Sequence, residues 1–266
     1  MNKSKINSSN DKVDDAIHLF SENKYSEAIN LLDSIYESYT NKPLLLNIKG
    51  ACFAGMKDFD SAINFYRNAI EIDPKYYKAY YNLGGALQEL GELDAAIRSY
   101  KKSISIQPKY AEAHNNLGNV YRQQGHLDEA LDSYSSAIQI SPEFIEALYS
   151  SGLTLEELDR IDEAIEKFKQ VLIFKPDFAE LHINLGVILQ QQNQNDEALE
   201  CFKKAIEIMP NSVEANNNLG NIFREKNILD EAKFFYKKAI SLKPSFYEAV
   251  FNLGVIYQEQ NQFKKA

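Results

Sequence analysis

The feature that most constrains this chain is a period of 34 residues that runs through nearly all of its sequence. Proline marks the period most plainly, because six of the seven prolines stand 34 residues apart, at Pro74, Pro108, Pro142, Pro176, Pro210 and Pro244. Glycine keeps the same period from Gly50 to Gly254, and alanine keeps it from Ala28 to Ala266. A period of roughly 20–50 residues indicates stacked repeats, each too small to bury its own apolar face.

Each period has the pattern of two helices. In residues 111–144, Leu117 and Tyr121 have the spacing of one helix face, and so do Ala130 and Tyr134 in the second half. The chain has only 11 glycines and 7 prolines in 266 residues, fewer than average, so it has little material for long loops. The sequence therefore predicts an all-α protein.

The same period predicts how the two helices are joined and packed. Gly125 can adopt the left-handed conformation that ends the first helix, and Asp128 can cap the second helix or complement its dipole. Pro142 closes the period because it cannot continue the second helix. The small residues Gly118 and Ala130 lie on opposite helices of one hairpin, so we expect the two backbones to approach closely there.

Composition excludes several classes of protein. The formal charge is −9, with no basic cluster, which argues against a nucleic-acid partner. No apolar run reaches the roughly 18 residues that a membrane span needs, so we expect neither a membrane partner nor insertion. The two cysteines, Cys52 and Cys201, cannot form a disulfide framework, and a cytoplasmic location is expected.

The spacing of large and small residues resembles that of the tetratricopeptide repeat family. In residues 111–144 the matching positions are His114, Leu117, Gly118, Tyr121, Ala130, Tyr134, Ala137 and Pro142. The tryptophan that the family has early in each repeat is absent throughout. The resemblance implies a right-handed α-solenoid of antiparallel helix pairs.

The period also divides the chain. We expect residues 1–8 to be disordered and residues 43–246 to form six tandem repeats. Residues 9–42 predict a degenerate capping repeat, with polar Lys12 and Asp15 on its outer face. Residues 247–266 predict a truncated eighth repeat, whose uncovered apolar end makes self-association possible.

Asparagine recurs in the first helix of most repeats, two residues before the repeat glycine. The members of this asparagine row are Asn82, Asn116, Asn184, Asn218 and Asn252. Asparagine is a poor interior helix former, which suggests that these amides are used. Further amides flank the row at Asn115, Asn119, Asn217 and Asn221.

The resemblance implies that the first helices line an inner groove, and the row is similar to the asparagine ladder of O-linked N-acetylglucosamine transferases. An amide both donates and accepts, so a ladder can bind the backbone of an extended peptide. Two alternatives stay open: duplication copied the asparagines, or each amide bonds a neighbouring helix. Glutamates in the last turns of these helices, Glu89, Glu157, Glu225 and Glu259, favour neutral or basic ligands if they face the groove.

Two functions are consistent with the sequence. The first is a non-catalytic protein interaction module that binds extended peptides. The second is the substrate-recruiting region of a larger enzyme, such as a glycosyltransferase, whose catalytic domain is absent from these residues. No catalytic, metal or cofactor site is expected, because His114 and His182 occupy packing positions and no other histidine has ligands at metal-binding spacing.

Overall fold

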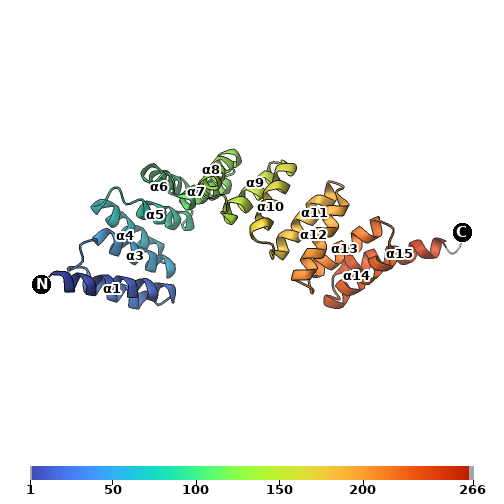
Figure 1. Ribbon diagram of the computed structural model, residues 1–266, viewed down its shortest axis with the longest axis horizontal. Coiled ribbons are helices and arrows are strands. Elements are labelled where there is room, and N and C mark those ends of the chain that lie inside the picture. Colours follow the sequence, from blue (N-terminus) through green and yellow to red (C-terminus); the bar gives the residue numbers. More distant parts are fainter. Residues whose placement is uncertain (1, 264–266) are drawn as a thin grey trace. The chain divides into compact units, whose positions relative to one another are not determined.

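The computed structural model describes residues 2–263 and folds them into fifteen α-helices that follow one another as hairpins (Figure 1). The all-α class and the antiparallel helix pairs predicted from the sequence are confirmed. The helices are α1 Asn2–Ser21, α2 Tyr25–Ile35, α3 Lys42–Gly55, α4 Phe59–Ile72, α5 Tyr77–Glu89, α6 Leu93–Ile106, α7 Ala111–Gln123, α8 Leu127–Ile140, α9 Ile145–Glu157, α10 Ile161–Phe174, α11 Ala179–Gln191, α12 Asn195–Ile208, α13 Val213–Glu225, α14 Leu229–Leu242 and α15 Tyr247–Phe263.

The chain divides into two compact units, residues 1–150 and residues 151–266, and the boundary falls within α9. In the first unit, α1 to α8 form four hairpins, and each hairpin packs on the next. In the second unit, α11 packs with α12 and α13 packs with α14, while α10 and α15 flank these two hairpins. The core of each unit is therefore a continuous stack of helix pairs.

The first helix begins earlier than the sequence predicts. Residues 1–8 are expected to be disordered, yet α1 starts at Asn2. This segment contains no glycine or proline, so nothing in it interrupts the helix that the following apolar residues require. Farther along α1, Lys12 and Asp15 are exposed while Val13 and Ala16 are buried, so the helix is polar on one face.

Six hairpins, from α3–α4 to α13–α14, each close around one glycine and one aromatic ring. A Cβ atom built on Gly118 would lie 2.6 Å from Cε1 of Tyr134, sixteen residues later on the second helix. The other pairs are Gly50–Tyr66, Gly84–Tyr100, Gly152–Phe168, Gly186–Phe202 and Gly220–Tyr236. These rings and the repeat alanines are buried, so the glycine makes room for a ring rather than only for a backbone.

The turn between the two helices of a hairpin has the same backbone conformation in seven repeats. One residue in each turn has a positive φ, as predicted for Gly125, whose φ is +78°. The equivalent residues are Asn23, Lys57, Gly91, Asp159, Asn193 and Asn227. Asp128, for which the sequence left two roles open, lies inside the first turn of α8, where its charge complements the helix dipole, and His126 is the N-cap.

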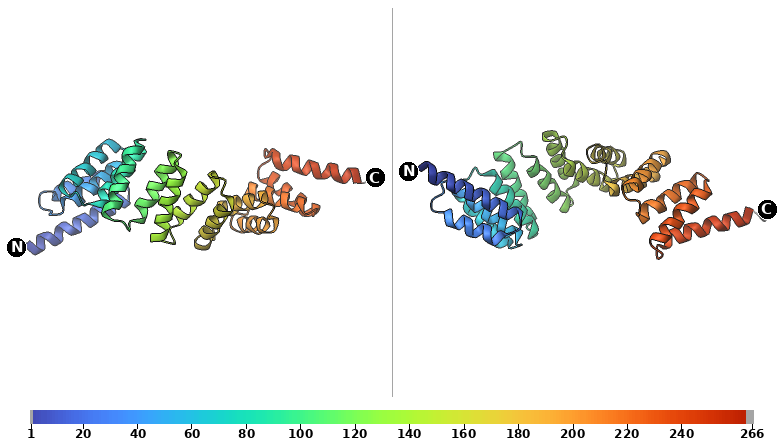
Figure 2. Two further views of the ribbon diagram at one scale, coloured as in Figure 1. Left: turned by 90° about the horizontal axis from the view of Figure 1, so that it is seen from above. Right: turned by 60° about the horizontal axis from the view of Figure 1, so that its bottom comes forward.

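The last helix has no following partner within the described residues. Its C-terminal end extends beyond α14 in both views of Figure 2. A Cβ atom on Gly254 would meet nothing within 4 Å, unlike the six paired glycines, and Tyr247 and Phe251 are 80% and 70% exposed. Ala266, the end of the predicted eighth repeat, lies outside the described residues.

Candidate functional site

The first helices of successive repeats form one continuous face in each unit. They contact one another, α1 with α3, α3 with α5 and α5 with α7 in the first unit, and α11 with α13 and α13 with α15 in the second. The second helices make no such contacts among the described residues. Because the first helices are closer together, the side that they form, here called the first-helix face, is the concave side of each unit.

The asparagine row lies along the first-helix face, and in the first unit its amides hold neighbouring helices together. Asn82 Nδ2 donates to Oδ1 of Asn47 at 2.9 Å, across the α3–α5 contact. Asn116 Nδ2 donates to the hydroxyl of Tyr81 at 3.0 Å, across the α5–α7 contact. Both bonds join residues 35 positions apart, so a row residue bonds the residue just before the row position in the preceding repeat.

In the second unit the row divides. Asn252 Nδ2 donates to Oδ1 of Asn221 at 3.0 Å and to Oδ1 of Asn217 at 3.5 Å, so it repeats the interhelical pattern. Asn184 and Asn218 have no protein hydrogen-bond partner within residues 2–263. For Asn218 the cause is visible in the sequence, because the residue 35 positions earlier is Ile183, which has no polar side-chain atom.

The flanking amides belong to the packing of the repeats. Asn119 and Asn221 accept from the hydroxyls of Tyr134 and Tyr236, each at 2.8 Å. Asn115 and Asn217 are buried, and Asn217 Nδ2 donates to Oε1 of Glu248 at 2.8 Å. Of the nine asparagines predicted to contact a peptide, Asn115, Asn217 and Asn252 are thus buried, and Asn184 is the most accessible.

Two small pockets open beside row residues. One, of about 250 Å³, lies among helices α3 to α7 and is lined by Tyr81, Asn82, Asn116 and Glu89 among others. The other, of about 370 Å³, lies beside α11, and Asn184 and Glu156 line it. The first pocket was not predicted from the sequence. Gly85, which directly follows the repeat glycine, could have indicated it, because a glycine there leaves space that a side chain would fill.

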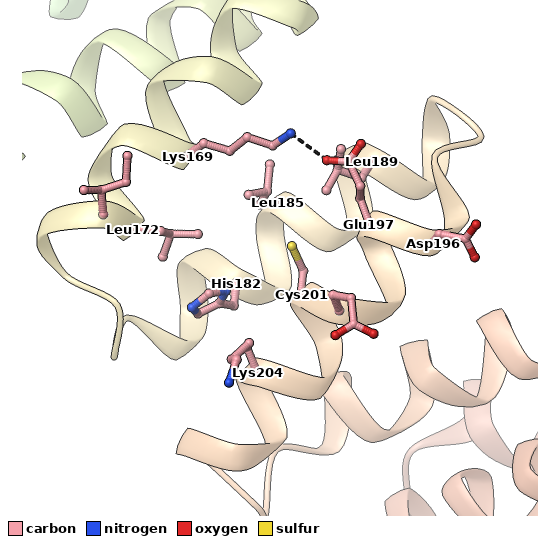
Figure 3. Close-up of a pocket in the computed structure, with 11 residues that line it drawn as sticks. Lys169, Leu172, His182, Leu185, Leu189, Asp196, Glu197, Cys201 and Lys204 are labelled. Atoms are coloured by element: carbon pink, nitrogen blue, oxygen red, sulfur yellow. Dashed lines mark hydrogen bonds and ion pairs between the residues drawn. The ribbon is translucent and has the colours of Figure 1, made fainter.

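A larger pocket of about 550 Å³ lies on the opposite side of the second unit, where α10 and α12 flank α11 (Figure 3). Leu172, Leu185 and Leu189 make it apolar, and an ion pair between Lys169 Nζ and Glu197 Oε2, 2.6 Å long, crosses its rim. Cys201 also lines it. Burial raises the pKa of the Cys201 thiol to about 11, so it stays protonated and is a poor nucleophile.

The two histidines at the position of the family tryptophan are structural. His114 Nε2 and His182 Nε2 each lie 3.0 Å from the carbonyl oxygen of the repeat proline six residues earlier, Pro108 and Pro176. A carbonyl oxygen only accepts, so Nε2 carries the hydrogen and donates it. Among the described residues no three His, Cys, Asp or Glu side chains gather as a metal site.

No helix within residues 2–263 has both the length and the apolar character needed to cross a bilayer. Residues 2–263 likewise hold no constellation of side chains that would serve catalysis. The arrangement offers instead a long face with amide groups, aromatic rings and carboxylates, which suits recognition of another chain.

Two family models match the chain. One described as TPR repeat matches residues 56–91, 85–125, 152–193 and 220–261. One described as tetratricopeptide repeat matches residues 111–144 and 179–212. Together these matches cover well over half of the sequence.

One curated relative is the small glutamine-rich tetratricopeptide repeat-containing protein 2 of Saccharomyces cerevisiae. It is 34% identical over 70 residues, which are 26% of this chain and 18% of that protein. The match thus spans less than a fifth of the relative's length.

Two solved structures show the same architecture over longer stretches. YrrB, a TPR protein with an unusual peptide-binding site, is 25% identical with a TM-score of 0.62, over 70% of this chain and 96% of its own. The C-terminal part of a TPR repeat-containing protein from Cytophaga hutchinsonii is 18% identical with a TM-score of 0.76, over 91% of this chain and 99% of its own. The second likeness concerns the fold alone.

Proposed function

Because the chain belongs to the tetratricopeptide repeat family, we propose that it is a non-catalytic interaction module that binds extended segments of protein partners on the first-helix face. The observation that carries this proposal is the division of the asparagine row. Asn184 and Asn218 lie on that face without protein partners, while other members of the row hold neighbouring helices. An unpartnered amide can both donate to and accept from the backbone of a bound peptide.

The peptide-binding site of YrrB supports the same proposal, because that protein is 25% identical over most of its length. The expected affinity is modest. Each amide contact contributes about 1 kcal/mol, and ordering a flexible segment subtracts from the sum. The amides bind backbone, so they tolerate many sequences, and selectivity has to come from pockets between them.

The proposal predicts that the two unpartnered amides matter for binding and not for folding. Short random peptides displayed on phage are selected on the whole chain, and their affinities are measured by fluorescence anisotropy. Replacing Asn184 and Asn218 together by Ala should weaken the binding of the selected peptides about thirtyfold, since two contacts of roughly 1 kcal/mol each are lost. The melting temperature should stay within a degree or two.

A matched control comes from the opposite side of a repeat. Asn64 and Asn68 are exposed asparagines on the second helix α4, and replacing both by Ala should leave peptide affinity unchanged. If the Asn184 and Asn218 variant binds as tightly as the unchanged chain, the amides are not the contact and the proposal is wrong.

The alternative, a substrate-recruiting region of a glycosyltransferase, stays a prediction. The family matches and the named relatives support a repeat protein, and they do not favour that branch of the family. Recruitment of a substrate would use the same face and the same amides, so the experiment above applies to both functions.

A further inference from the structure

Two glutamates at the same repeat position have different surroundings. Glu225, in the last turn of α13, accepts two hydrogen bonds from the preceding repeat. Gln190 Nε2 donates to its Oε1 at 2.7 Å, and Asn195 Nδ2 donates to its Oε2 at 3.1 Å. The two donors come from positions 35 and 30 residues earlier, so each carboxylate oxygen has its own amide donor.

Glu89 is the equivalent of Glu225 four repeats earlier, and it lacks both donors. The residues 35 and 30 positions before it are Ala54 and Phe59, neither of which carries a polar side-chain atom. Glu89 is exposed, and no side chain within residues 2–263 forms a hydrogen bond or an ion pair with its carboxylate. Ala54, Phe59 and Glu89 all line the pocket of about 250 Å³ on the first-helix face.

The rest of this pocket is aromatic and open. Tyr81 and Tyr100 line it, with ring centroids 5.8 Å apart; Tyr81 is partly exposed, and Tyr100 is buried behind it. Gly85 keeps one wall free of a side chain, and the equivalent residues Val187 and Val255 would fill that space. A carboxylate without a donor thus stands at the rim of a pocket with two tyrosine rings.

We propose that this pocket receives a cationic side chain, specifically arginine, from a segment bound on the first-helix face. This inference rests on the proposed function and adds a sequence preference to it. A guanidinium group presents two parallel N–H groups to a carboxylate, which replaces the two separate amide donors that Glu225 has. Its planar face can also stack on the partly exposed ring of Tyr81, which a lysine ammonium does less well.

The test compares the affinities of two labelled peptides that differ in one side-chain group. Both are Gly-Ser peptides of equal length, one with a central arginine and the other with citrulline, which is uncharged and has nearly the same shape. Fluorescence anisotropy with the whole chain should show the arginine peptide binding about fivefold more tightly at low salt, as expected for one exposed charged contact.

Three variants locate the preference. Glu89→Gln removes the charge, and Ala54→Gln returns the amide donor that the chain itself uses at Gln190. Each should bring the affinity ratio of the two peptides close to one. Glu225→Gln is the matched control, because that carboxylate already has its donors, and it should leave the ratio unchanged.

Equal affinities of both peptides for the unchanged chain would overturn the arginine pocket and leave peptide binding by the amides intact. A ratio that persists in Glu89→Gln would also overturn it. If neither peptide binds, Nα-acetylarginine methylamide and its citrulline twin are titrated while the amide NMR signal of Gly85 is followed. A shift with the arginine compound alone supports the pocket without the proposed function, and equal or absent shifts refute it.

Discussion

At the scale of single residues, the glycine that packs against a ring in six of the first helices is the position with the least room for change. A Cβ atom on Gly220 would lie 2.5 Å from Cε1 of Tyr236, a ring that is itself fully buried. We expect Gly220→Ala to lower the free energy of unfolding by about 1–3 kcal/mol, because the ring has to shift within a packed core. Urea unfolding followed by circular dichroism measures the change.

The chain supplies its own control at Gly254, the same position in α15. No atom lies within 4 Å of the Cβ built there, so alanine meets no ring. Gly254→Ala should therefore leave stability unchanged or raise it by up to about 1 kcal/mol through better helix propensity. Equal losses in the two variants would contradict the role of the aromatic ring, because Gly254 has no ring against it.

The sequence predicts the role of these glycines, but it does not predict the role of the asparagine row. Gly118 and Ala130 predict that the two helices of a hairpin approach closely, because small residues recur at these two positions in successive repeats. The use of the amides of Asn82 and Asn116 depends on the residue 35 positions earlier, Asn47 or Tyr81, and on which rotamer reaches it. A period of 34 residues identifies the row, but it does not tell a contact between helices from a contact with a ligand.

At the scale of elements, the turn inside each hairpin matters most, because it needs a left-handed residue. Lys57 has a φ of +64° in the turn between α3 and α4, where Gly91 and Gly125 stand in the next two repeats. A side chain with a Cβ atom is strained in this region by roughly 1 kcal/mol or more. Lys57→Gly should therefore stabilise the chain by about 1 kcal/mol, measured as a higher urea midpoint at an unchanged m value.

The reverse exchange is the control for this prediction. Gly91→Lys places a side chain at a φ of +78° and should destabilise the chain by a similar amount. No atom lies within 4 Å of the Cβ position on Gly91, so any loss reports backbone strain and not a clash. A neutral result for both variants would contradict the role of the left-handed turn.

The all-α class and the order of the hairpins could be predicted from the sequence, because the 34-residue period and the spacing of apolar residues on a helix face indicate the same helix pairs. The start of α1 did not follow, since a polar segment such as residues 2–8 has no apolar face from which to predict a helix. The pocket at Glu89 did not follow either. It arises from Ala54 and Phe59 on two other helices, and only the folded stack brings them beside Glu89.

At the scale of the whole molecule, the two units differ in the rings that close their hairpins. The first unit uses Tyr66, Tyr100 and Tyr134, whereas the second uses Phe168, Phe202 and Tyr236. Burial raises the pKa of Tyr66 and Tyr100 well above the usual value and raises the pKa of Tyr236 to about 12. Phenylalanine at two equivalent positions shows that the fold tolerates a ring without a hydroxyl.

These raised pKa values predict a loss of stability in alkali. Above pH 10 the tyrosines ionise in the unfolded chain while the buried rings stay protonated, so unfolding releases protons and becomes more favourable as the pH rises. Each such tyrosine lowers the free energy of unfolding by about 1.4 kcal/mol per pH unit until its folded pKa is reached. Replacing Tyr66 and Tyr100 by Phe should therefore move the midpoint of alkaline unfolding, followed by circular dichroism between pH 8 and pH 12, to higher pH.

The control for the alkaline experiment is Tyr247→Phe, because the Tyr247 ring is 80% exposed and its surroundings change little on unfolding. That variant should unfold at the same pH as the unchanged chain. The free energy of unfolding of the Tyr66 and Tyr100 variant at pH 7 reports the effect of lost packing. Only the lost ionisation makes the difference in stability between the variant and the unchanged chain grow with pH. An unchanged alkaline midpoint in this variant would show that deprotonation of the buried rings does not drive unfolding.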